Sequence, residues 1–100
     1  MKKYEIIFER DVQKVYRRLP KDLIARLDRA ILALANDPRP PGCKKLTGFD
    51  LYRIRVGDWR VTYAIEDDKL IVLVVEVAPR GDAYRHLWFR RGRRAVPDRL

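Results

Sequence analysis

The fold is decided by the stretch Leu51-Tyr-Arg-Ile-Arg-Val-Gly-Asp-Trp-Arg-Val-Thr-Tyr63, which predicts two antiparallel strands joined by a two-residue turn. Apolar and polar residues alternate on both sides of Gly57-Asp58, as expected for strands that cover a core with one face. The short loop fixes the register: Val56 lies opposite Trp59, Ile54 opposite Val61 and Tyr52 opposite Tyr63. All three pairs are apolar or aromatic, so the predicted hairpin is internally consistent.

The same register places Arg55 directly opposite Arg60, with Arg53 two residues away on the same face. Like charges that face each other across a ladder are destabilising, and Asp58 is the only acidic residue between positions 51 and 65. A single arginine on a strand surface is normally just solvated. Three arginines that converge on one face instead predict an anionic ligand, and phosphate is the natural candidate.

The composition indicates a polyanionic partner. The 100 residues include 23 Lys and Arg against 14 Asp and Glu, which gives a formal net charge of +9. Such a balance is typical of proteins that bind nucleic acid or an acidic protein, and the apolar runs are too short to span a membrane. The single cysteine, Cys43, excludes an internal disulfide and predicts a cytoplasmic protein. With one histidine and scattered acidic residues, no metal site or cofactor is predicted.

Two helices are predicted before the hairpin. Asp11 is the expected N-cap of the first, whose apolar stripe comprises Val12, Val15, Tyr16 and Leu19. Pro20 ends this helix and stands at the entry to the second, which ends near Asn36-Asp37-Pro38. The apolar face of the second helix comprises Leu23, Ile24, Leu27, Ile31 and Leu34.

The remaining segments complete an α+β domain. Tyr4 to Phe8 alternates as a short first strand, and the apolar run from Leu70 to Val77 predicts a strand covered on much of both faces. A short C-terminal helix is expected over residues 83–90, followed by a basic tail within residues 89–100. We therefore predict a single domain over residues 1–100, in which two helices pack on a small twisted antiparallel sheet.

This order of elements resembles the RelE/ParE superfamily of toxins from bacterial and archaeal type II toxin–antitoxin systems. The most specific parts of the resemblance are Lys45-Leu-Thr-Gly48, the hairpin described above and Val77-Ala-Pro-Arg-Gly-Asp-Ala-Tyr84. The cationic hairpin is similar to that of the RelE branch, whose members cut mRNA in the ribosomal decoding site. The resemblance implies a metal-independent, ribosome-dependent endoribonuclease, or mRNA interferase.

The resemblance also implies the catalytic residues. Arg53 and Arg55 stand where the RelE branch often has lysines, Arg60 matches the arginine that begins the next strand, and Arg80 and Tyr84 match a terminal pair. Because an arginine does not give up its proton, Arg53 and Arg55 can stabilise charge but cannot act as a base. Attack of a ribose 2′-OH on the next phosphate needs a base, cations and a proton for the leaving oxygen. Tyr84 is the expected base, Arg60 holds the phosphate, and Arg80 serves the leaving oxygen.

Partners follow from the same comparison. Lys44, Lys45 and Arg85 are expected to contact the RNA backbone, with a solvated loop as an equal alternative for the two lysines. Besides mRNA and the ribosome, the expected partner is an acidic, RelB-like antitoxin that folds around the cationic surface and forms a hetero-oligomer with the toxin.

Three alternatives remain open. The chain is also compatible with a ParE-like inhibitor of DNA gyrase, which binds without catalysis, and with a noncatalytic RNA-binding module on the same fold. Tyr84 can also simply pack its ring. An arginine and a tyrosine four residues apart favour the enzyme, because a module that only binds RNA has no need of such a pair.

Overall fold

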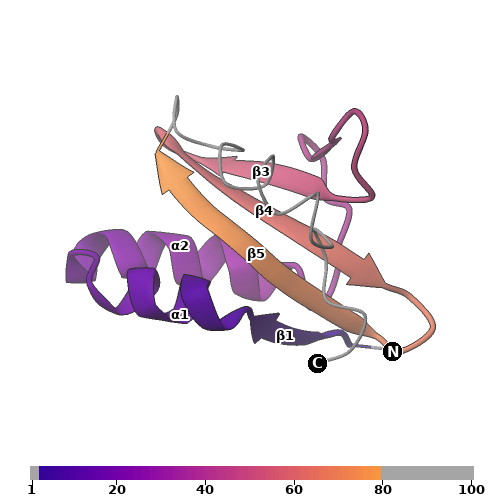
Figure 1. Ribbon diagram of the computed structural model, residues 1–100, viewed down its shortest axis with the longest axis horizontal. Coiled ribbons are helices and arrows are strands. Elements are labelled where there is room, and N and C mark those ends of the chain that lie inside the picture. Colours follow the sequence, from indigo (N-terminus) through magenta and orange to yellow (C-terminus); the bar gives the residue numbers. More distant parts are fainter. Residues whose placement is uncertain (1–2, 80–100) are drawn as a thin grey trace.

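The computed structural model describes residues 3–79, which form two helices and a five-stranded sheet (Figure 1). The elements are β1 (Glu5–Phe8), α1 (Arg10–Arg17), α2 (Lys21–Ala33), β2 (Lys44–Lys45), β3 (Tyr52–Val56), β4 (Trp59–Glu66) and β5 (Ile71–Pro79). The strand order is β1-β5-β4-β3-β2; β1 runs parallel to β5, and the other neighbours are antiparallel. The predicted α+β architecture is confirmed, while the predicted helix over residues 83–90 lies outside the described residues.

The β3–β4 hairpin has the predicted register. Val56 pairs with Trp59, and the ladder continues without a shift to the pair Tyr52 and Tyr63. Gly57 has a φ of 62°, in the left-handed region that a two-residue hairpin turn requires and that glycine adopts without strain. An added Cβ at Gly57 would also collide with the guanidinium of Arg26, which α2 places against this turn.

Both helices cover one face of the sheet, and the main core lies between the two layers (Figure 1). The buried members of this core are Val12, Leu23, Leu27, Ile31 and Leu34 from the helical layer, with Ile54, Val61, Tyr63, Val72, Val74 and Val77 from the sheet. The sheet residues include the predicted inward face of the hairpin. The hydroxyl of Tyr16 on α1 donates to Asp28 of α2 at 2.5 Å, which holds the two helices together.

Two predictions about α1 were wrong. Its N-cap is Glu9, and Asp11 lies in the first turn, where its carboxylate still faces the positive end of the helix dipole. Val15 is 47% exposed, although it was expected in the apolar stripe. Val12, Tyr16 and Leu19 alone form the inward face, and Val15 lies about 100° around the helix from Tyr16.

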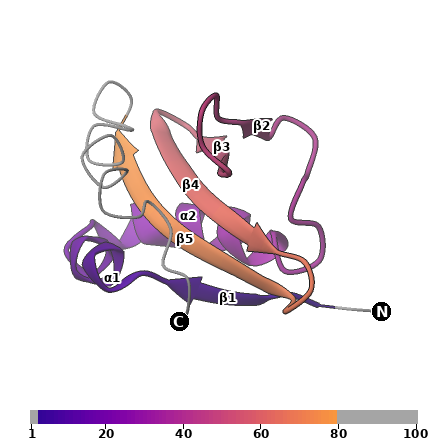
Figure 2. The same cartoon turned by 45° about the vertical axis from the view of Figure 1, so that its right-hand side comes forward.

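The second face of the sheet has a smaller apolar cluster, away from the β3–β4 turn. Leu51, Ala64, Leu73 and Val75 form it, and Ile7, Leu46 and Phe49 pack against them. Because β5 contributes buried residues to both faces, the prediction for the run from Leu70 to Val77 is confirmed. Figure 2 shows β1 and β2 at opposite edges of the sheet, with the long loop from α2 leading to β2. Within residues 3–79, no helix is long and apolar enough to cross a membrane.

Candidate functional site

Three arginines lie on the sheet face opposite the helices. Arg55 and Arg60 are directly paired in the β3–β4 ladder, as predicted, and Arg53 pairs with Thr62. The alternation of β3 places Arg53 and Arg55 on the face opposite Ile54, which packs in the helical core. The hairpin therefore brings the three predicted side chains to one surface, which we call the cationic face.

Arg53 differs from the other two arginines because it is only 8% exposed. It begins a row of cross-strand partners that continues through Thr62 on β4 to Glu76 on β5, both of which are buried. A β-bulge between Thr62 and Tyr63 creates this row, because Thr62 pairs with Glu76 while Tyr63 pairs with Val74. A buried carboxylate therefore lies on the cationic face, two strands away from Arg53.

The two lysines of β2 point to different sides of the sheet. Lys44 pairs with Arg53 and so lies on the cationic face, where it is exposed. Lys45 pairs with Tyr52 on the other face, and its Nζ lies 3.8 Å from a carboxylate oxygen of Asp50. The structure thus brings Lys44 together with the predicted arginines and does not do so for Lys45.

Two hollows lie beside Arg55. The first, which we call the tip pocket, has a volume of about 140 Å³ and is lined by Arg55, Gly57, Asp58, Trp59 and Arg60. The second, which we call the edge pocket, has a volume of about 300 Å³ and is lined by Pro41, Gly42, Lys44, Arg53, Ile54 and Arg55. Arg55 therefore forms part of the wall of both pockets.

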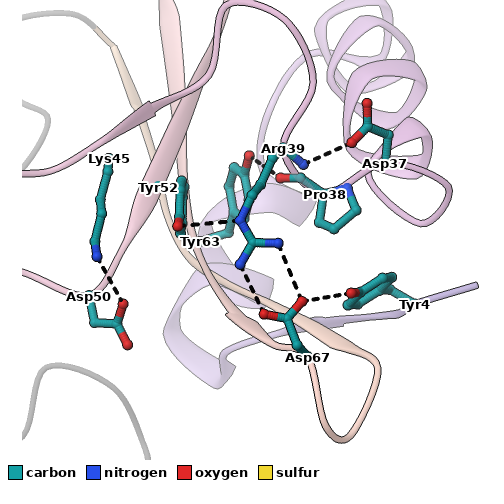
Figure 3. A network of polar contacts seen from close by, with 9 residues as sticks. All are labelled: Tyr4, Asp37, Pro38, Arg39, Lys45, Asp50, Tyr52, Tyr63 and Asp67. Carbon is teal, nitrogen blue, oxygen red and sulfur yellow. Dashed lines mark hydrogen bonds and ion pairs between the residues drawn. The ribbon is translucent and has the colours of Figure 1, made fainter.

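The loop that walls the edge pocket is anchored at its beginning. The buried hydroxyl of Tyr63 donates to the carbonyl oxygen of Pro38 at 2.8 Å. The next residue, Arg39, donates to both carboxylate oxygens of Asp67, at 3.3 and 2.9 Å, and to the hydroxyl of Tyr52 at 3.3 Å (Figure 3). These contacts tie the loop to β3, to β4 and to the β4–β5 turn.

Asp67 is the shared acceptor of this network. Besides Arg39, it accepts a hydrogen bond of 2.7 Å from the hydroxyl of Tyr4, just before β1 (Figure 3). The hydrogen bond from Arg39, followed by the one from Tyr4, lowers the pKa of the Asp67 carboxyl below its ordinary value. The network is exposed and lies at the end of β4 away from the arginines, where its contacts position the loop.

The remaining predicted site residues, Arg80, Tyr84 and Arg85, lie outside residues 3–79, and their roles stay predictions. Pro79, which precedes Arg80 in the chain, ends β5 and pairs with Trp59. In the part of the chain that the structure describes, no group of three or more His, Cys, Asp or Glu side chains is placed to hold a metal ion.

The sequence did not predict which residues line the two pockets, or the row of cross-strand partners Arg53, Thr62 and Glu76. Pro41 and Gly42 carry no sequence signal for a site, although the pair of Lys44 and Arg53 brings their loop to the sheet edge. Thr62 opposite Arg53 was implicit in the predicted hairpin register. Glu76 had no such signal, because its place in the row depends on the bulge.

Comparison with known proteins identifies the family. The model of the family described as ParE toxin of the type II toxin–antitoxin system, parDE, matches residues 5–84. The chain belongs to the ParE/RelE toxin family. This RelE-like toxin is 28% identical, over 88 residues, to a Methanocaldococcus jannaschii protein that carries the name toxin RelE1; the aligned part spans 84% of this chain and 98% of the relative.

Solved structures show the same relationship. The archaeal RelE–RelB complex from Pyrococcus horikoshii is 31% identical in sequence and superposes with a TM-score of 0.71, covering 81% of this chain and 99% of the matched chain. The intact Escherichia coli RelBE toxin–antitoxin complex is 26% identical, with a TM-score of 0.69 and coverage of 76% and 95%. The RelE-like fold of this toxin is thus shared with toxins crystallised with an antitoxin.

Proposed function

We propose that this RelE-like toxin is a ribosome-dependent endoribonuclease that acts on mRNA in the cytoplasm. The observation that supports the proposal most strongly is the cationic face, where Lys44, Arg53, Arg55 and Arg60 converge around two hollows. Two of these residues, Arg55 and Arg60, stand opposite each other although like charges in a ladder are unfavourable. A phosphate between them would remove that repulsion.

The proposed reaction needs no metal. The ribose 2′-oxygen bonds to the adjacent phosphorus, the bond from phosphorus to the 5′-oxygen breaks, and the products carry a 2′,3′-cyclic phosphate and a 5′-hydroxyl. Tyr84 takes the 2′-OH proton, and nearby cations favour its phenolate. Arg60 binds the phosphate oxygens with its forked donors while Arg53 and Arg55 stabilise the added negative charge. Arg80 serves the leaving 5′-oxygen by delivering the proton of the new 5′-hydroxyl, or by a hydrogen bond while water supplies that proton.

Dependence on the ribosome follows from these residue types. A tyrosine base has an ordinary pKa near 10 and the pKa of an arginine acid is higher still, so neither matches neutral pH. Such a site gains most from a partner that holds the RNA with its 2′-OH in line with the phosphate. We therefore propose that the ribosome supplies substrate orientation and that free RNA is a poor substrate.

The proposed regulator is an acidic antitoxin. The structures of similar toxins from Pyrococcus horikoshii and Escherichia coli are complexes with RelB. A net charge of +9 on this chain favours an acidic segment that covers the cationic face and neutralises its arginines. The toxin and its antitoxin would then form a hetero-oligomer in which the RNA site is blocked.

A gyrase inhibitor is the second candidate, and the description of the matching family model as a ParE toxin favours it. The two candidates make different demands on the molecule. A gyrase inhibitor acts by binding and has no need of a base, whereas the nuclease depends on Tyr84.

The test is to add the purified toxin to a cell-free translation reaction and to map mRNA ends by primer extension. The nuclease predicts new ends within translated codons, with 5′-hydroxyl groups that polynucleotide kinase phosphorylates without prior phosphatase treatment. A supercoiling assay with DNA gyrase, run in parallel, tests whether the toxin inhibits gyrase. Intact mRNA together with blocked supercoiling would establish the gyrase inhibitor, and RNA binding without cleavage would indicate a noncatalytic module.

A further inference from the structure

The edge pocket is a second candidate anion site beside the tip pocket. Lys44 and Arg53, which face each other across the β2–β3 ladder, both line it, and Arg55 closes the side toward the hairpin turn. The Cα atoms of Arg53 and Arg55 are about 7 Å apart, the distance of two residues along a strand. The two pockets are therefore neighbours along β3 and share one wall.

Arg53 supplies the strongest reason to expect an anion. The side chain is 8% exposed, and it makes no hydrogen bond or ion pair with any other residue among residues 3–79. A guanidinium held largely out of water without a counter-ion is unfavourable, and the free energy is recovered when an anion binds. Lys44, exposed at the mouth of the same pocket, adds a second positive charge.

The backbone of β3 offers a further donor. The amide of Leu46 donates to the carbonyl oxygen of Leu51 at 2.9 Å, so the polar backbone groups of Leu51 point toward the β2 edge. The direction of the backbone N–H and C=O groups repeats every second residue in a ladder. The backbone groups of Arg53 and Arg55 therefore also point toward the β2 edge. The β2–β3 pairing ends at Lys44 and Arg53, which leaves the backbone N–H of Arg55 facing the edge pocket.

We propose that the edge pocket binds a second phosphate of the same RNA strand, next to the phosphate held in the tip pocket. This inference rests on the proposed function and specifies its substrate as single-stranded RNA held by two consecutive phosphates. Arg55 lies between the two phosphates and contacts both. Lys44 and Arg53 fix the register of the strand and thereby help to position the scissile bond over Arg60.

The test compares 2′-O-methyl oligonucleotides with one, two or three phosphates, which have no 2′-OH and are not cut. Dissociation constants are measured by NMR titration for the parent, for Lys44→Ala and for Lys69→Ala, a control with the same charge change in the exposed β4–β5 turn. For the parent and Lys69→Ala, the second phosphate should tighten binding roughly tenfold and the third much less. In Lys44→Ala the gain in affinity from the second phosphate should be lost. The slope of the logarithm of affinity against the logarithm of salt concentration should become shallower by about 0.7.

The proposal is overturned if Lys44→Ala keeps the full gain from the second phosphate. It is also overturned if every added phosphate contributes equally in all three proteins, because that pattern indicates diffuse attraction without a built pocket. Since the oligonucleotides are uncleavable, this outcome is independent of nuclease activity. A toxin that fails to cut mRNA, yet gains affinity from the second phosphate and not from the third, would refute the proposed function. It would still support a phosphate site in the edge pocket.

Discussion

Arg55 lies directly opposite Arg60 in the β3–β4 ladder, at the second residue pair from the hairpin turn. Like charges directly opposite each other in a ladder are unfavourable, whereas opposite charges at such a pair would be favourable by about 0.2–1 kcal/mol. We propose that the like-charge pair is retained because it binds a phosphate of the RNA.

Arg55→Glu is therefore expected to raise the melting temperature of the free toxin while it abolishes RNA binding. The introduced carboxylate faces Arg60 and replaces repulsion with attraction. Lys69→Glu carries the same charge change away from Arg60 and should leave both properties near those of the parent. Thermal melts and RNA titrations measure the two effects. An Arg55→Glu protein that melts below the parent would show that repulsion between Arg55 and Arg60 does not destabilise the free toxin.

The hydroxyl of Tyr63 should contribute more to the free energy of unfolding than the hydroxyl of Tyr52, although the two rings stack with centroids 6.2 Å apart. Tyr63→Phe leaves the buried carbonyl oxygen of Pro38 unpaired, at an expected cost of about 1–3 kcal/mol. Tyr52→Phe removes an exposed acceptor of Arg39 and should cost less than about 0.5 kcal/mol. Chemical denaturation measures the free energy of unfolding of both variants. Equal losses of stability would mean that the Tyr63 hydroxyl does not anchor the loop.

Asp67 should make stability depend on pH in the acidic range. Its folded-state pKa is lowered, mainly by the hydrogen bond from Arg39, so its contribution is present above the unfolded value near 4 and is lost as pH falls through the folded value. Asp67→Asn should melt below the parent at pH 7, and the difference should shrink as pH falls below about 4. Asp68→Asn, in the same turn, is the matched control, because it leaves the pair of Arg39 and Asp67 intact. A difference that stays constant with pH would rule out the ionic contribution.

Tyr84→Phe tests the proposed base, because it keeps the ring and removes only the hydroxyl. Cleavage should fall by roughly 10²- to 10⁴-fold, the range expected for loss of a general base, while the melting temperature stays near that of the parent. If the ring merely packs, Tyr84→Phe should cut normally and Tyr84→Ala should lose stability instead. An active Tyr84→Phe toxin would end the assignment.

The hairpin could be predicted from the sequence because two local rules determine it together. The two-residue loop at Gly57-Asp58 fixes which residues are opposite, and the alternation of apolar residues fixes which face is buried. Every pair from Val56 and Trp59 to Tyr52 and Tyr63 agrees with both rules. The shared face of Arg53, Arg55 and Arg60 follows directly from this register.

The burial of Arg53 and the position of Glu76 could not be predicted in the same way. Alternation gives the face of Arg53 but not the neighbours beside it, because the pairing of Lys44 with Arg53 lies outside the hairpin that the two rules determine. The apolar run of β5 has no alternation to define its register with β4. The bulge that brings Glu76 opposite Thr62 therefore has no local signal. The bonds from Arg39 to Asp67 likewise join a loop and a turn 28 residues apart.

The most direct test of the central claim, that the cationic face cuts mRNA on the ribosome, is primer extension with Arg60→Ala in a translation reaction. Arg60 is proposed to hold the scissile phosphate, so its loss should lower cleavage by roughly 10²- to 10³-fold, as for other groups that stabilise transition-state charge. Lys69→Ala should cut at the parent rate and positions, and thermal melts should show that both variants are folded. A folded Arg60→Ala toxin that produces the parent pattern of mRNA ends at the parent rate would contradict the account.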